Sequence, residues 1–91
     1  MKYGIYCIKD QLIGFMTPTL EKNDDVAKRN FKSSVNRMDH SGDYIVNDLA
    51  LYCCGEFDVE TGVITSKDPT LLCTSLQCLS ILNLLRNPDT T

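Results

Sequence analysis

The 91-residue chain contains five cysteines, whose thiolates can bind zinc or act as nucleophiles: Cys7, Cys53, Cys54, Cys73 and Cys78. Zinc sites use paired Cys or His ligands about two to four residues apart, with the pair repeated. Cys53 and Cys54 are adjacent, so a strand would point them to opposite faces, and Cys73 and Cys78 are too widely spaced. We expect no metal site. We expect the thiols to pack as small apolar groups in a reducing compartment.

His40 is the only histidine, and it lies close to the end of a predicted helix. A catalytic relay needs a nucleophile, a base and an orienting group that converge in space, and the loop neighbours of His40 do not supply this. The carboxylates of Glu56, Asp58 and Glu60 fall in one predicted turn, without a second acidic motif of defined spacing. The sequence has no phosphate-binding loop and no dinucleotide fingerprint. We therefore expect neither an enzyme nor a cofactor.

Basic residues form one group, on a predicted helix and on the first predicted strand. Such residues can hold phosphates, which gives salt-dependent affinity for nucleic acid, and exposed tyrosines can stack on the bases of a single strand. The competing interpretation is a solvated helix face offset by Asp24, Asp25 and Asp39, and the net charge of −3 excludes a uniformly basic protein. The candidate DNA-binding residues are Lys28, Arg29, Lys32, Arg37, Lys9, Tyr6 and Tyr52.

Two predicted hairpins and a helix would position these groups. Apolar alternation over residues 49–57 predicts a strand with Leu49, Leu51, Cys53 and Phe57 on one face. Asp58, Gly62 and a short return strand at 63–65 follow, which predicts a hairpin. Residues 2–17 repeat the spacing with Asp10 and Gly14, which suggests a second hairpin of the same type. Between them, residues 24–38 carry an apolar stripe at helical spacing, with the basic residues beside it. Gly55, inside a strand, is typical of a bulge or a close backbone approach.

The C-terminal segment is rich in leucine. Thr74 and Gln77 form a capping box, which predicts a second helix from Ser75 to about Arg86. Its apolar residues surround most of the helix, and a domain this small cannot bury such a helix alone. We therefore expect a homo-oligomer, most simply a dimer, that associates through Leu76, Leu79, Leu82 and Leu85. No stretch is typical of a signal peptide or a membrane span.

Together these patterns predict one α+β domain over residues 1–91 with the order ββαββα. An antiparallel sheet of two hairpins would be covered on one face by the amphipathic helix. Residues 68–91 would form a C-terminal apolar segment.

Four stretches resemble in sequence and order the small nonstructural protein of gokushoviruses, which are single-stranded DNA phages of the Microviridae. They are residues 2–10, residues 14–19, residues 23–25 with Ala27 and 29–31, and residues 48–52 with 55–58 and 61–62. The resemblance covers residues 2 to about 65. It implies a phage accessory protein in the host cytoplasm that binds single-stranded DNA during genome replication and packaging. Two features depart from the family: Leu12 and Ile13 replace polar residues, and the tail after Pro69 has no match.

The alternative function is a protein-interaction factor that binds a phage or host protein without contacting nucleic acid. The negative net charge and the leucine-rich tail favour it.

Overall fold

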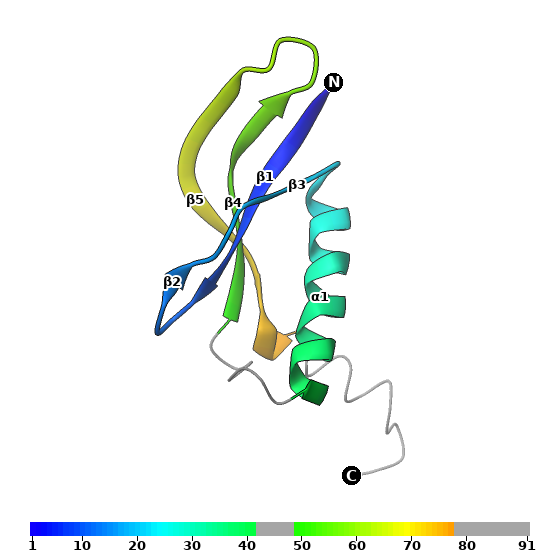
Figure 1. The fold of residues 1–91 in the computed structure, drawn as a ribbon, viewed down its shortest axis with the longest axis vertical. Coiled ribbons are helices and arrows are strands. Elements are labelled where there is room, and N and C mark those ends of the chain that lie inside the picture. The colour runs from blue at the N-terminus through cyan, green and yellow to red at the C-terminus, as the bar shows by residue number, and fades with distance from the viewer. Residues whose placement is uncertain (42–48, 78–91) are drawn as a thin grey trace.

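The computed structural model describes residues 1–41 and 49–77 of the chain (Figure 1). The elements are β1 (Lys2–Asp10), β2 (Gly14–Phe15), β3 (Thr19–Glu21), α1 (Asp24–Ser41), β4 (Leu49–Asp58) and β5 (Ile64–Thr74). A helical turn at residues 75–77 follows β5. No helix of the described part is long and apolar enough to cross a membrane.

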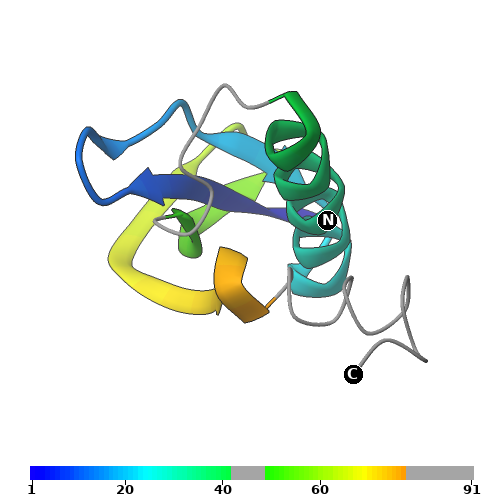
Figure 2. The same cartoon turned by 90° about the horizontal axis from the view of Figure 1, so that it is seen from below.

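All five strands join one antiparallel sheet in the order β2-β1-β4-β5, and β3 pairs with the first half of β1. β1 forms its longest ladder with β4, where Asp10 lies opposite Leu49 and Lys2 lies opposite Asp58. α1 runs along one side of the sheet, which curls around it (Figure 2). The α+β class is therefore confirmed, with a helix layer on one face.

The predicted arrangement of two hairpins and two helices is only partly matched. Both hairpins form, but β3 adds a short strand before α1, and β5 extends to Thr74 although a return strand of only three residues was expected. Pro69 lies in the edge strand β5, within residues 67–69 that have no register partner in β4, so its missing N–H removes no hydrogen bond of the ladder. The ten-residue β4 can therefore be paired along most of its length. The predicted C-terminal helix beyond residue 77 lies outside the described residues.

The two hairpin turns have the same construction, as their shared spacing predicts. Asp10 Oδ1 accepts hydrogen bonds from the backbone N–H groups two and three residues later, at 2.8 and 3.3 Å. Asp58 Oδ1 does the same at 2.9 and 3.3 Å. Gly14 and Gly62 then take positive φ values of 106° and 75°, which other residues rarely adopt. In both turns the aspartate therefore satisfies backbone N–H groups and the glycine allows the positive φ, and both interactions involve residues of the turn itself.

Gly55 marks a bulge in β4, as predicted. The β4–β5 register shifts between Cys53 and Gly55, and a Cβ at Gly55 would collide with the carbonyl oxygen of Thr65. Relative to β1, β4 has one extra residue here, Cys54, so the residues of β4 after it point to the opposite faces from those expected by simple alternation. Phe57 therefore lies opposite Tyr3 on the face away from α1, and the prediction that it shares a face with Leu49 and Leu51 is wrong.

The core lies between α1 and the face of the sheet that it covers, which we call the inner face. Ala27, Phe31 and Val35 of α1 pack there, against a set of buried strand residues: Tyr6, Leu49, Leu51 and Cys53. The predicted stripe of Ala27, Phe31, Ser34, Val35 and Met38 is thereby confirmed as the core face at Ala27, Phe31 and Val35. Asn23 begins the helix by accepting a 2.9 Å hydrogen bond from the backbone N–H of Val26 through Oδ1.

Candidate nucleic-acid interface

The structure separates the predicted DNA-binding residues into two groups on opposite sides of the sheet. Tyr6 belongs to the core cluster on the inner face, so alternation along β1 places Lys9 on the opposite face, which we call the outer face. Tyr52 lies there as well, because it pairs with Cys7. The cations of α1 lie on the helix that packs against the inner face. The predicted residues therefore do not form one continuous track.

Lys9, Phe15 and Tyr52 form a cluster on the outer face. Lys9 and Phe15 are register partners across the β1–β2 hairpin, and Lys9 Nζ lies 5.4 Å from the centroid of the Phe15 ring. The rings of Phe15 and Tyr52 meet edge to face, with centroids 5.4 Å apart and an interplanar angle of 73°. Phe15 is 48% exposed and Tyr52 is half-buried. No other element of the described part packs over this face (Figure 2).

The Lys9–Phe15–Tyr52 cluster combines the two groups that non-specific single-strand binding requires. Aromatic rings can stack on any base because every base has a π face, and the lysine ammonium can bind a phosphate. Sequence reasoning missed Phe15. The available signal was the shared Asp–Gly spacing of the two turns, which places Phe15 directly opposite Lys9.

Tyr6 is not available for base stacking, contrary to the prediction. Its side chain is only 2% exposed, and its hydroxyl donates a 2.7 Å hydrogen bond to Asp24 Oδ1 at the start of α1. Burial, followed by the neighbouring Asp24 carboxylate, raises the pKa of the Tyr6 phenol above its usual range. Tyr6 therefore joins β1 to α1 and belongs to the core.

The cations of α1 are available to solvent. Lys28 and Lys32 are half-buried and lie one helical turn apart, whereas Arg29 and Arg37 are exposed. None of these four residues has a carboxylate within ion-pair distance among the described residues. Arg37 lies on a different side of the helix and donates a 3.3 Å hydrogen bond to Ser34 Oγ. Arg37 is thus separated from the other three cations.

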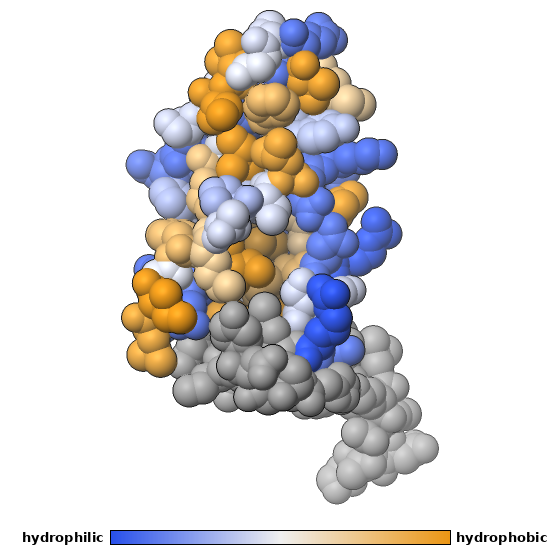
Figure 3. All heavy atoms as spheres, viewed as in Figure 1, coloured by the Kyte–Doolittle hydropathy of each residue, from blue (hydrophilic) through white to orange (hydrophobic). Residues whose placement is uncertain are grey.

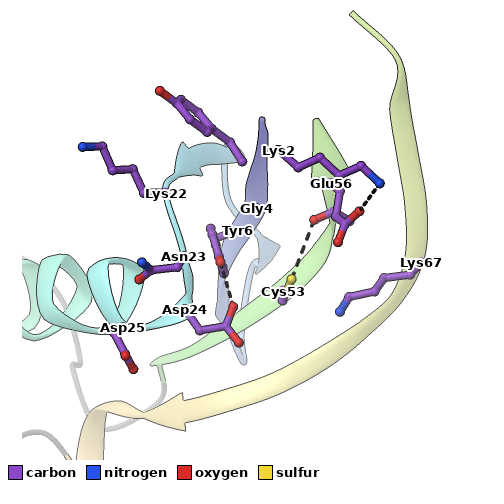
Figure 4. A pocket seen from close by; sticks show the side chains of 12 residues that line it. Lys2, Gly4, Tyr6, Lys22, Asn23, Asp24, Asp25, Cys53, Glu56 and Lys67 are labelled. Carbon is purple, nitrogen blue, oxygen red and sulfur yellow. Dashed lines mark hydrogen bonds and ion pairs between the residues drawn. The ribbon is translucent and has the colours of Figure 1, made fainter. Parts of the chain in front are cut away.

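A cleft of about 540 Å³ opens beside the N-terminus of α1 (Figure 4). Lysines and carboxylates line it together, so their charges offset one another. Lys2 lies 3.6 Å from Glu56 in an ion pair, Lys67 projects into the cleft from β5, and Lys22 points away. The cleft therefore offers a phosphate little net attraction. The charged lining residues are Lys2, Lys22, Lys67, Asp24, Asp25 and Glu56.

The described cysteines are all free thiols. Cys7 lies buried on the outer face, and burial and a hydrogen bond with the Cys54 thiol raise its pKa to about 11. A thiol with so high a pKa is a weak nucleophile at neutral pH. Among the described residues, no group of three or more His, Cys, Asp or Glu side chains is arranged to hold a metal ion.

Of the predicted self-association residues, the structure describes Leu76, which is 55% exposed. Leu79, Leu82 and Leu85 lie outside the described residues. The capping box that was expected to begin this segment is confirmed. The backbone N–H of Gln77 donates to Thr74 Oγ1 at 3.3 Å, and that of Thr74 donates to Gln77 Oε1 at 2.9 Å.

The comparisons with known proteins give one match. A protein-family model described as Phage ORF5 protein matches residues 3–78, which is most of the chain. No curated protein and no solved structure matches.

Proposed function

Because the chain belongs to the Phage ORF5 protein family, we propose that it binds single-stranded DNA, without catalysis, during phage genome replication or packaging in the host cytoplasm. The observation that supports this function is the Lys9–Phe15–Tyr52 cluster on the outer face, over which no other described element packs. Duplex bases are stacked on one another, so such a surface favours a single strand. The resemblance to the small nonstructural protein of gokushoviruses favours the same ligand.

The charge distribution along the sheet favours DNA contact at one end of the outer face. The acidic β4–β5 turn, with Asp58 and Glu60, lies beside Lys2, at the opposite end of β1 from Lys9 (Figure 1). Lys9 follows Lys2 by seven positions along β1, which at about 3.3 Å per residue is roughly 23 Å. This separation exceeds the Debye length of about 8 Å at physiological salt, so the turn repels a strand at Lys9 only weakly.

The test is a titration of a fluorescently labelled oligothymidine at low and at physiological salt. Replacing Phe15→Ala or Tyr52→Ala removes one stacking ring, which is worth about 1–3 kcal/mol per base, so we expect each variant to bind roughly 5- to 100-fold more weakly. Ile64→Ala is the matched control, because Ile64 is 66% exposed at the far end of the same face. Undetectable binding at low salt, or equal affinities for all variants, would exclude this function.

A protein-interaction factor is the second candidate, and the β1–β2 turn favours it. Leu12 and Ile13 are 78% and 76% exposed at the tip of this turn. A turn that exposes two adjacent large apolar residues is typical of a protein contact. If DNA binding is absent, this function predicts that the wild-type protein captures a phage or host partner from infected cells. The Leu12→Ser, Ile13→Ser variant should not capture this partner.

Self-association through the leucine-rich tail is also a proposal. Replacing Leu76, Leu79, Leu82 and Leu85 with serine should convert a dimer to a monomer in a sedimentation experiment. A wild-type protein that stays monomeric at high concentration would contradict it.

A further inference from the structure

α1 carries a second positively charged surface, which we define as Lys28, Arg29 and Lys32. Four residues at 1.5 Å each place Lys28 and Lys32 about 6 Å apart along the helix axis. Arg29 is exposed next to them. Asp25 lies one turn before Arg29, but it forms no ion pair with any of the three. These three charges are therefore free to bind phosphate.

This surface differs in chemistry from the Lys9–Phe15–Tyr52 cluster. Phe31, the only Phe, Tyr or Trp of α1, is buried in the core with Ala27 and Val35, so it offers no ring for stacking beside Lys28, Arg29 and Lys32. Hydrophilic residues gather over α1, whereas hydrophobic residues are spread over the strands (Figure 3). The surface of Lys28, Arg29 and Lys32 can thus contact phosphates, and no aromatic side chain among these three residues is present to stack on bases.

The two surfaces lie on different layers of the fold, one on α1 and one on the outer face of the sheet. The core between α1 and the inner face separates them, and Lys9 and Tyr52 lie beyond the sheet on the outer face. The same few nucleotides cannot touch both surfaces, because the helix layer and the sheet stand between them (Figure 2).

We propose that the α1 surface is a second, phosphate-only binding site, so that one protein molecule holds two segments of single-stranded DNA at once. The proposal rests on the proposed function, since the other segment is the one bound at the Lys9–Phe15–Tyr52 cluster. A protein of this kind would bring distant parts of a single-stranded genome together and compact it.

Binding stoichiometry with a short oligothymidine tests the proposal. The oligonucleotide must be too short to pass around the sheet, and the complexes are weighed by native mass spectrometry at low salt. We expect two oligonucleotides per chain for the wild type and one for the Lys28→Gln, Lys32→Gln variant. Lys22→Gln, an exposed lysine that precedes α1, is the matched control and should keep two. Counting per chain separates this result from dimerisation.

Energy transfer between donor- and acceptor-labelled oligonucleotides gives the second readout. Mixing both with the wild type should produce transfer, and the Lys28→Gln, Lys32→Gln variant should lose most of it while still binding one oligonucleotide. The proposal of a second site would be overturned if each wild-type chain bound only one oligonucleotide. It would also be overturned if the Lys28→Gln, Lys32→Gln variant still bound two. A Phe15→Ala, Tyr52→Ala variant that still binds two would instead overturn the proposed function.

Discussion

The hydrogen bond from Tyr6 to Asp24 joins the central strand to the helix, and Tyr6→Phe removes it while keeping the ring. The Tyr6 hydroxyl donates to Asp24 Oδ1 at 2.7 Å, and the tyrosine is only 2% exposed. Hydrogen bonds to charged groups contribute about 1.5–3 kcal/mol to stability. Asp24 is itself exposed, so we take the low end, about 1.5 kcal/mol. For a domain of this size that is roughly 6–12 °C in Tm.

Urea unfolding followed by circular dichroism measures this loss. The midpoint should fall while the slope m stays unchanged, because the surface exposed on unfolding is the same. Tyr3→Phe is the matched control, since Tyr3 lies on the outer face and its hydroxyl has no hydrogen bond within the described residues. Its free energy of unfolding should stay within about 0.5 kcal/mol of wild type. An equally small effect of Tyr6→Phe would refute the reasoning.

Gly4 provides a second test of the same contact. A Cβ at Gly4 would overlap the hydroxyl end of the Tyr6 ring, so Gly4→Ala must displace the ring and break its hydrogen bond. At an unstrained site the same change stabilises a protein by about 0.4–1 kcal/mol, whereas here we expect destabilisation. In the Tyr6→Phe background the hydrogen bond is already gone, so Gly4→Ala should cost less there. Strictly additive effects would contradict the coupling.

Three further predictions follow from local contacts. Hydrogen bonds from the N–H groups of the β4–β5 turn lower the pKa of Asp58. The stability that the Asp58 carboxylate contributes is therefore present above its unfolded pKa and is lost as the pH falls. The Asp58→Asn variant should lose less stability than wild type in an acid titration. Burial raises the pKa of Cys7 to about 11, so the stability of the protein should fall as the pH rises from about 9 to 11. In alkaline urea titrations, the stability of the Cys7→Ala variant should fall less than that of wild type. Thr74→Ala removes the helix cap and should cost about 0.5–2 kcal/mol, with unfolding midpoints as the measurement.

The features that the sequence predicts correctly depend on contacts between near neighbours. Asp10 and Asp58 bind N–H groups two and three residues away, and Thr74 and Gln77 cap each other across three residues. These signals are complete within a few positions, so they need no knowledge of the tertiary structure.

The features that the sequence does not predict depend on which face of the sheet α1 covers. β1 has apolar or aromatic residues on both faces, so alternation alone cannot decide whether Tyr6 or Cys7 faces the core. Because α1 covers the Tyr6 face, Tyr6 is buried, and Lys9 lies on the opposite side of the sheet from the cations of α1. β2 is only two residues long, too short for an alternation that would identify Phe15.

The length of β5 has a similar origin. Lys67, Asp68 and Pro69 are typical of a turn, yet they lie inside β5. The residues on either side of them, Ser66 and Thr70, pair with Gly55 and Cys53 of β4. The partner strand therefore overrides the local preference of these residues.

Photocrosslinking tests the central claim most directly. An oligothymidine that carries 4-thiothymidine is bound to the wild-type protein at low salt, irradiated and digested, and the attached peptides are identified by mass spectrometry. Single-strand binding on the outer face predicts crosslinks at Phe15 and Tyr52 that disappear when unlabelled oligothymidine is added in excess. Crosslinks confined to the β4–β5 turn around Asp58, or none that unlabelled DNA can displace, would contradict it.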